Sequence, residues 1–394
     1  MRSEVLILGG YGTTGAVLAE LLLGYSDATV VLAGRDLGRA ERAAAELGPR
    51  FQGRVTARVA DAADPASLDR ALDGVGLVAV AASVLDHAGA VAGAALRAGA
   101  DYFDLLLGSP GKYAALEALR PRVEGEGRCF ITDGGIHPGL SAAMIRALAP
   151  AYTRLERADV AGLLKVDWAA YDFAASTVHE FVTELAGYST GALRDGAWVE
   201  LPWKEAIKRF DFGPPFAVER CSTMAMEELR RLPEQIPSLR DCGFYVSGFN
   251  PVADNVLLPL GMVVMKVAPR RLGKPYARLF AWGLRRYSRP PYGVIWQLEA
   301  DGEPAPGGPL SGGAAGAPAA GRAGLRLIHD DGYWLTAAAA AACLLQYLDG
   351  SLRTPGVHLQ ALAVDPARML RDLQHMGVRL EGRKLDVGAL LGAR

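Results

Sequence analysis

The chain has 394 residues and a formal net charge of −1, with positive and negative side chains in nearly equal number. This length is enough for two domains with sizeable cores, and the balanced charge gives no electrostatic case for a nucleic-acid partner. Four scattered cysteines fit neither a metal-ligand spacing nor a disulfide framework, so we expect no metal site. The most apolar segment, residues 256–268, contains a lysine and is too short to span a bilayer, so a membrane partner is not favoured.

The first element in chain order is an apolar run over residues 5–8, which ends in closely spaced glycines. A helical pattern over residues 16–23 follows, and this strand–turn–helix context is typical of a dinucleotide fingerprint. We expect Gly10 to permit the turn, Gly12 to let the backbone approach a pyrophosphate, and Gly15 to let helix and strand pack closely. The candidate cofactor-binding residues here are Gly10, Tyr11, Gly12, Thr13, Thr14 and Gly15. The alternative is a glycine-rich turn that binds no ligand.

The second predicted strand, residues 29–33, leads into Gly34, Arg35 and Asp36. The residue at this strand end reads the adenosine ribose: a carboxylate pairs with the 2′-hydroxyl of NAD, and an arginine accommodates the 2′-phosphate of NADP. Arg35 therefore favours NADP(H) over NAD(H). The alternative is that Arg35 is a solvated loop charge and that Asp36 binds the ribose of NAD(H).

The alternation of strands and helices continues to residue 132. Strands are predicted over residues 55–59, 76–84, 102–106 and 129–132, with helices over 42–47, 65–72, 88–98 and 112–123 between them. The pattern predicts an α/β fold with a Rossmann doubly wound parallel sheet. Because ligands bind at the carboxyl ends of such strands, Asp61, Ser83 and Asp104 are further cofactor-binding candidates. Ser83 could instead cap a helix, and Asp104 could instead brace a loop.

After residue 131 the elements become less regular. Strands are predicted over residues 152–166 (one or two), 197–201, 244–249, 293–299 and 325–329, and helices over 177–185, 226–232 and 336–348. Residues 301–324, rich in glycine, proline and alanine, are interpreted as a hairpin loop or surface insertion. Arg285, Arg286 and Arg289, with Tyr287 and Tyr292 nearby, form the densest basic and aromatic cluster. This cluster could anchor a substrate carboxylate, contact acidic lipid headgroups together with the apolar tract before it, or be a solvent-facing helix end.

Several segments together resemble one family, the saccharopine dehydrogenase-like NADP-binding oxidoreductases. They are the glycine turn, residues 33–35, 98–105, 134–140, 243–250 and 331–333. The resemblance covers most of the chain. It implies a Rossmann domain over 1–133, an α+β substrate and dimerisation domain over 134–330, and a C-terminal segment, 331–394, that packs back toward the first domain. It also implies a homodimer.

The catalytic candidates follow from this arrangement. His137 lies just beyond the sixth predicted strand and is the candidate proton donor, although it could also only hydrogen-bond its own loop. Tyr171 and His179 flank a predicted helix start and could line the substrate side or be structural. We expect a cytoplasmic NADPH-dependent oxidoreductase that transfers hydride to a small C=N, C=O or C=C substrate. The alternatives are a catalytically inactive dinucleotide-binding regulatory protein and a peripheral-membrane lipid enoyl reductase.

Overall fold

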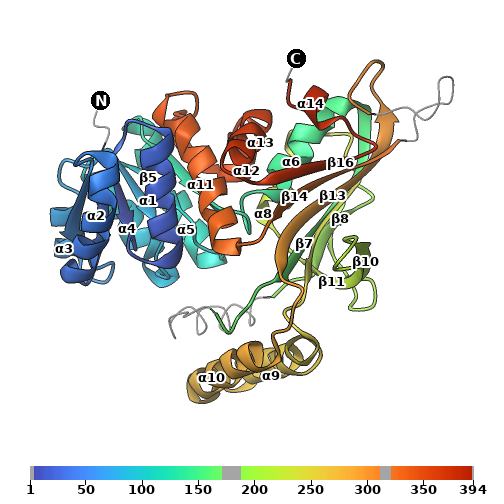
Figure 1. Ribbon diagram of the computed structural model, residues 1–394, viewed down its shortest axis with the longest axis horizontal. Helices are drawn as coiled ribbons and strands as arrows, with labels where there is room; N and C mark the ends of the chain where they lie inside the picture. The colour runs from blue at the N-terminus through green and yellow to red at the C-terminus, as the bar shows by residue number, and fades with distance from the viewer. Residues whose placement is uncertain (1–3, 171–187, 311–320, 393–394) are drawn as a thin grey trace. The chain divides into compact units, whose positions relative to one another are not determined.

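The computed structural model describes residues 4–170, 188–310 and 321–392, which form two compact units (Figure 1). One unit contains Met1–Ala143 and Tyr333–Gly377, and the other contains Met144–Gly332 and Val378–Arg394. The segment 331–394, which the resemblance treats as one piece, is thus divided between them. Strand pairing gives the physical reason, because one part of this segment adds a strand to the sheet of the first unit and the rest adds a strand to the sheet of the second.

The first unit contains a seven-stranded sheet in which every adjacent pair is parallel, which confirms the predicted Rossmann fold. Apolar residues dominate the strands and most are buried, as expected for strands with both faces covered. In spatial order the strands are β15 (Gly356–Leu359), β6 (Cys129–Thr132), β5 (Asp101–Asp104), β4 (Leu77–Val80), β1 (Glu4–Leu8), β2 (Thr29–Gly34) and β3 (Val55–Val59). From β1 the strands are added first on one side, as β2 and β3, and then on the other side, from β4 onward. The space between β1 and β4 is therefore the switch point, where ligands bind in such sheets.

The predicted helices of the first unit are present but differ at their ends. The first helix continues through Gly24 to Tyr25, because Gly24 is exposed and its backbone stays helical. The predicted strand 76–84 is shorter, since the chain turns after Val80 into a short 3-10 helix. The helices are α1 (Thr13–Tyr25), α2 (Leu37–Phe51), α3 (Pro65–Ala71), α4 (Ala88–Arg97), α5 (Pro110–Gly125), α11 (Gly332–Leu348), α12 (Gln360–Ala363) and α13 (Pro366–His375), and α6 (Ser141–Leu148) crosses the boundary between the units. Helices α6, α12 and α13 were not predicted.

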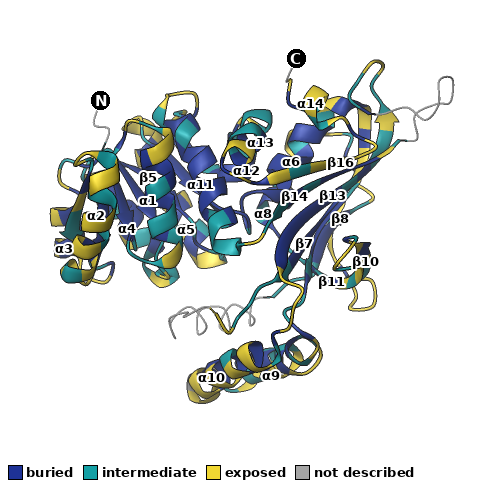
Figure 2. Ribbon diagram, in the orientation of Figure 1, coloured by how far each residue is buried: buried dark blue, intermediate teal, exposed yellow. Residues whose placement is uncertain are grey.

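Helix α11 returns the chain to the first unit and is buried along most of its length (Figure 2). Six consecutive alanines, residues 337–342, are fully buried, and their small side chains let the helix backbone approach its neighbours closely. Near the end of the helix the Tyr347 hydroxyl donates to Asp101 Oδ2 at 2.5 Å, and Asp101 Oδ1 accepts from the Cys129 amide at 2.9 Å. These bonds tie α11 to the start of β5 and β6.

The second unit is built on a nine-stranded mixed sheet whose centre is the long strand β7 (Tyr152–Lys165). The sequence allowed one or two strands here, and the structure has one. It pairs in parallel with β12 (Asp241–Ser247) and antiparallel with β13 (Gly293–Pro304). The other strands are β8 (Gly191–Arg194), β9 (Ala197–Glu200), β10 (Ile207–Asp211), β11 (Val218–Met224), β14 (Arg322–His329) and β16 (Arg379–Arg383); the helices are α8 (Glu227–Arg231), α9 (Leu258–Val267), α10 (Pro269–Tyr287) and α14 (Val387–Leu390).

The glycine-rich stretch 301–324 connects β13 to β14, so its interpretation as a hairpin connection is confirmed. The two strands reach further into it than predicted, since β13 ends at Pro304 and β14 begins at Arg322. The predicted helix 177–185 lies outside the described residues.

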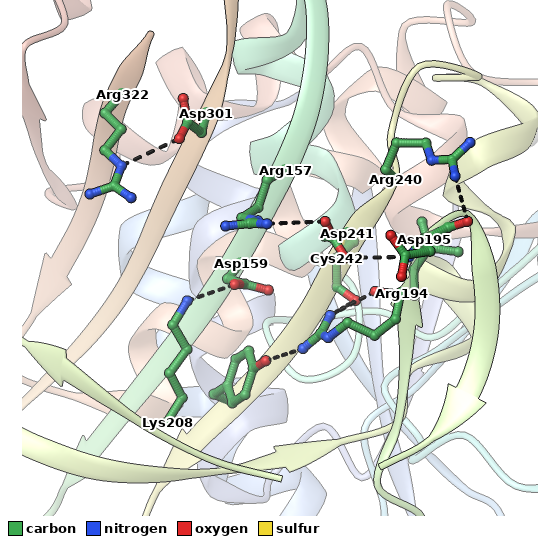
Figure 3. A network of polar contacts seen from close by, with 12 residues as sticks. Arg157, Asp159, Arg194, Asp195, Lys208, Arg240, Asp241, Cys242, Asp301 and Arg322 are labelled. Atoms are coloured by element: carbon green, nitrogen blue, oxygen red, sulfur yellow. Dashed lines mark hydrogen bonds and ion pairs between the residues drawn. The ribbon is translucent and has the colours of Figure 1, made fainter. Parts of the chain in front are cut away.

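Polar contacts join the strands on one side of this sheet (Figure 3). Lys208 Nζ lies 2.7 Å from Asp159 Oδ2, which links β10 to β7. Arg157 on β7 pairs with Asp241 on β12 at 3.2 Å. Arg194 on β8 donates to the Tyr245 hydroxyl at 2.5 Å. Each contact joins elements that are distant in sequence, so together they fix the register of the outer strands.

A buried ionic cluster lies at the carboxyl ends of β5 and β6 in the first unit. Lys112 Nζ is 3.1 Å from Asp104 Oδ1 and 2.7 Å from Asp133 Oδ1, and all three side chains are fully buried. The ammonium also donates to the Leu106 carbonyl at 2.9 Å. Burial alone would lower the pKa of Lys112, but the two carboxylates outweigh it and raise that pKa.

Neutral donors complete the cluster. The Thr132 hydroxyl donates to Asp104 Oδ2 at 2.6 Å, and the Tyr113 hydroxyl donates to Asp133 Oδ2 at 2.6 Å. Burial, together with the charge of Asp104, raises the pKa of Asp133 even though Lys112 opposes the shift. One cation therefore holds two carboxylates and joins β5, β6 and α5, which sets the course of the chain after β6.

Replacing Lys112 with methionine should destabilise the protein strongly, because Asp104 and Asp133 would stay buried without their cation. We expect a loss of about 3–5 kcal/mol in the free energy of unfolding, measured by urea denaturation. As the control, Lys204→Met at an exposed site should change that free energy by no more than about 0.5 kcal/mol. A Lys112→Met variant as stable as the control would show that the cluster does not hold the strand ends together.

Candidate functional site

The turn after β1 is shaped by glycines that cannot carry a side chain. Gly9 has a φ of +88°, and a Cβ there would lie 2.9 Å from the Ala82 backbone nitrogen in the segment after β4. A Cβ on Gly10 would lie 2.9 Å from the Ile7 carbonyl oxygen, and one on Gly15 only 2.2 Å from the Gly9 carbonyl oxygen. The positive φ of the turn is therefore at Gly9, one residue before the predicted position. The close packing assigned to Gly15 fits the geometry.

Gly12 is the N-cap of α1, and it leaves the start of that helix without a side-chain cap. Four other helices of the unit have a side-chain cap: Asp36, Asp64, Ser109 and Asp365 accept from backbone amides at the starts of α2, α3, α5 and α13. Helices α4 and α12 start without one, as α1 does. The first amides of a helix have no partner within it. At α1 the amides of Thr13, Thr14 and Gly15 therefore offer an anion site backed by the helix dipole.

Tyr11 extends from this turn to the end of β2. Its hydroxyl accepts from the Asp36 amide at 3.1 Å, and the Arg39 guanidinium lies 4.9 Å from the centre of its ring. A Cβ on Gly34 would lie 2.5 Å from the Tyr11 hydroxyl, so Gly34 makes room for the ring. Arg35 follows directly and is exposed, as is Arg39. The end of β2 thus presents two guanidinium groups beside the glycine turn.

Asp36 has a structural task here. Its Oδ1 accepts from the Arg39 amide at 3.0 Å and caps α2. This bond engages the carboxylate that, in the alternative interpretation, would bind the ribose of NAD. The roles of Arg35 and Asp36 toward the ribose stay predictions.

Asp61 and Ser83 follow β3 and β4. Asp61 Oδ1 accepts from the Ala63 amide at 3.0 Å, and its own amide donates to Ser67 at 3.1 Å. Ser83 is exposed and lies one residue after Ala82, which contacts the glycine turn. Ser83 is therefore close to the switch point, whereas Asp61 follows the outer strand β3. A cofactor role for either stays a prediction.

Asp104 lies inside the ionic cluster rather than on an open edge. Besides Lys112 and Thr132, its carboxylate accepts from the Leu106 amide at 3.0 Å. These contacts agree with the alternative prediction, in which Asp104 braces a loop. A contact of Asp104 with the cofactor stays an untested prediction.

His137 lies on the loop after β6, and a buried glutamine from the C-terminal part of the unit holds that loop. Gln360 Oε1 accepts from the Gly135 amide at 3.2 Å, and its Nε2 donates to the carbonyls of Gly135 and Gly139 at 3.0 and 2.9 Å. Burial lowers the pKa of His137 to about 4, so the imidazole is neutral at pH 7. Tyr171 and His179, the other two catalytic candidates, lie outside the described residues.

Sequence reasoning missed Arg39, Lys112 and Gln360. Arg39 has a recognisable signal, because it stands one helical turn after Arg35. Lys112 and Gln360 have none, since each acts through partners that only the folded chain brings near. No group of three or more His, Cys, Asp or Glu side chains that could hold a metal is found in the described residues, nor is any described helix long and apolar enough to cross a membrane.

The residues present fit a dinucleotide. An uncapped helix start matches a diphosphate, and two exposed guanidinium groups match a further phosphate. Apart from the two chain neighbours of Gly12, the one atom of the described residues within 4 Å of a Cβ added there would be the Gly9 carbonyl oxygen, 3.1 Å away. The chemistry of the donor groups and the open backbone therefore point to the same ligand.

Comparison with known proteins agrees with this site. The family model of the saccharopine dehydrogenase NADP binding domain matches residues 5–127. Apo saccharopine dehydrogenase (L-Glu forming) from Saccharomyces cerevisiae is similar in structure, with a TM-score of 0.64, 16% identity, and coverage of 96% of this chain and 99% of that chain. At this identity the likeness shows a shared fold.

Two further structures have TM-scores too low to bear on the fold. GenD2 from gentamicin A biosynthesis, in complex with NAD, has a TM-score of 0.39, with 16% identity and 96% coverage of both chains. A short-chain dehydrogenase/reductase from Veillonella parvula, in complex with NADP, has a TM-score of 0.22 and 24% identity, and the match covers 26% of this chain and 46% of that chain. No curated protein sequence matches the chain. The glycine turn, the sheet order and the family model lead to one conclusion: residues 5–127 match the saccharopine dehydrogenase NADP binding domain, in a chain that shares the saccharopine dehydrogenase fold.

Proposed function

We propose that this protein is an NADPH-dependent reductase of a small substrate with a C=N bond. The observation that carries the cofactor part is the uncapped start of α1 beside the two exposed guanidinium groups at the end of β2. The acceptor part rests on the neutral state of His137. The competing acceptors are C=O and C=C bonds.

The chain's own groups would bind the cofactor at three places. The amides of Thr13, Thr14 and Gly15 would hold the diphosphate, and Gly12 would let the backbone approach it. Arg35 would hold the 2′-phosphate, with Arg39 as a second cation. Asp36 Oδ1 is already engaged in capping α2, so Asp36 is a poorer partner for the 2′-hydroxyl of NAD. This supports NADP(H) over NAD(H).

His137 would act on the substrate from the loop after β6. When bound, the reduced nicotinamide supplies a hydride. An imidazole with a pKa of about 4 is a weak base and is uncharged at neutral pH, so it donates a hydrogen bond rather than a proton. A protonated imine already carries its proton and needs only to be held in place. The low pKa of His137 thus supports C=N over acceptors that need an acid. A homodimer is proposed from the family resemblance alone. A cytoplasmic location is proposed from the composition of the chain.

Gly12→Ala should weaken both cofactors without unfolding the protein. Its Cβ would occupy the approach of the diphosphate, and we expect the Kd values of NADPH and NADH, measured by calorimetry, to rise at least about tenfold. The added Cβ would lie 3.1 Å from the Gly9 carbonyl oxygen, a tight contact that a small backbone shift relieves, so stability should fall by about 1 kcal/mol. By contrast, Gly15→Ala should cost at least about 2 kcal/mol, because its Cβ would lie 2.2 Å from a backbone oxygen. Unchanged cofactor binding in Gly12→Ala would contradict the diphosphate site.

Arg35→Ala should raise the Kd of NADPH about 10- to 100-fold and leave that of NADH within about twofold, because only NADPH carries the 2′-phosphate. Arg39→Ala should shift the same preference by a smaller factor. Arg70→Ala, at an exposed site on α3, is the control and should leave both values unchanged. Equal weakening of both cofactors by Arg35→Ala would assign that residue another role.

The activity is tested by NADPH oxidation, followed by absorbance at neutral pH, against cyclic imines, aldehydes, ketones and α,β-unsaturated esters. We expect imines to react at least about tenfold faster than the other classes. His137→Asn should lower kcat about tenfold or more with the Kd of NADPH within about twofold, whereas exposed His375→Asn should change neither. Tight NADPH binding with no turnover of any class would instead favour the inactive regulatory protein, and faster enoyl or carbonyl reduction would reject the imine.

A further inference from the structure

Helix α9 and the π-helical turn that leads into it, Ala253–Leu257, expose an apolar row on the side that faces away from their own core. Val256, Leu260, Val263 and Val267 are spaced four, three and four residues apart, which places them along one face. Their exposed fractions are 57%, 43%, 59% and 77%. Water-exposed helix faces normally carry polar side chains, so this row marks a surface that another apolar phase covers.

The inner face of the same segment is packed against other apolar side chains. Leu257, Met265, Tyr276 and Phe280 pack into one buried cluster between α9 and α10, and Trp168 and Phe249 close it at the ends of β7 and β12. The Ser288 hydroxyl donates to the Val166 carbonyl at 3.1 Å and fastens the end of α10 to the end of β7. The exposed row is therefore separate from the apolar side chains that pack α9 against α10. Residues 255–292, which contain both helices, form a helical hairpin.

Helix α10 adds apolar and basic side chains to the same hairpin. Leu272, Leu279 and Trp282 are exposed on it, and Figure 2 shows α10 with long exposed stretches. Arg271, Arg278 and Arg285 recur every seven residues and so lie in one row on its exposed side. Apolar and cationic rows thus run side by side along the helix.

The charge of the helical hairpin is one-sided. Residues 255–292 contain no Asp or Glu, whereas the whole chain has a net charge of −1. Its basic residues are Lys266, Arg270, Arg271, Lys274, Arg278, Arg285, Arg286 and Arg289. A second copy of this chain would bring two such sets of cations together, so charge repulsion disfavours self-association through this face. A surface that is both apolar and negatively charged complements it.

We propose that the helical hairpin docks the protein on an anionic lipid surface, with Val256, Leu260, Val263 and Val267 entering the acyl boundary and the arginines and lysines contacting phosphate headgroups. No described helix is long and apolar enough to span a bilayer, so the hairpin lies in the interface plane. Basic residues near such a surface each add to the attraction, and salt weakens it. The proposal stands apart from the reductase activity, because docking needs no cofactor.

The test is co-sedimentation of the full chain with vesicles of equal parts phosphatidylcholine and phosphatidylserine, and with vesicles of phosphatidylcholine alone. We expect binding to the anionic vesicles at least about tenfold stronger than to the neutral ones, and a marked loss on going from about 0.1 M to about 0.5 M salt. Val263→Asp with Val267→Asp, and separately Lys274→Glu with Arg278→Glu, should each weaken binding at least about tenfold. All four side chains are exposed, so the fold should survive.

Val218→Asp, at an exposed valine on β11, is the matched control and should bind as the unchanged chain does. Cofactor binding by every variant, measured by calorimetry, separates a docking defect from a folding defect. Absence of binding to anionic vesicles would overturn the proposal, as would equal binding to both vesicle types. Sedimentation-velocity evidence of a dimer that Val263→Asp with Val267→Asp dissociates, without vesicle binding, would assign the face to a second copy instead.

Discussion

The close approach of α1 to β1 is the constraint on which the cofactor site depends. A side-chain carbon on Gly15 would lie 2.2 Å from the Gly9 carbonyl oxygen, so the helix can start here only without one. This contact places the first amides of α1 at the switch point of the sheet, and Gly12 leaves them uncapped. Gly34, at the end of the next strand, likewise has no Cβ, and this leaves room for the ring of Tyr11. The site is thus made largely by backbone and by absent side chains.

The parts of the fold that local pattern specifies could be predicted from the sequence. Strands of the parallel sheet are buried on both faces and appear as short apolar runs, and the glycine turn marks the first crossover. The predicted ends of strands were less accurate where tertiary contacts determine them. The strand predicted over residues 76–84, for example, ends at Val80. Strand β15 was not recognised, because its four residues become a strand only by pairing with β6, more than two hundred residues earlier in the chain.

The candidate site shows the same division. Arg35 could be proposed from its place after β2, but nothing in the sequence indicated that the Asp36 carboxylate accepts from the Arg39 amide and caps α2. Lys112 reads in sequence as an ordinary helix lysine, and its two carboxylate partners depend on the packing of α5. In the sequence, residues 258–267 are only an apolar tract, and the structure separates its buried side from its exposed one.

The interrupted connectivity of the first unit has a consequence for how the chain folds during synthesis. The edge of β6 is unpaired until residues 356–359 have been translated, and the loop that carries His137 lacks its glutamine clamp for the same period. All residues between β6 and residue 356 are synthesised before β15. During that time the open edge of β6 is accessible to chaperones and to neighbouring chains. A chain shortened before residue 356 would keep its glycine turn and lose the strand and the clamp together, which couples the integrity of the loop that carries His137 to the completion of translation.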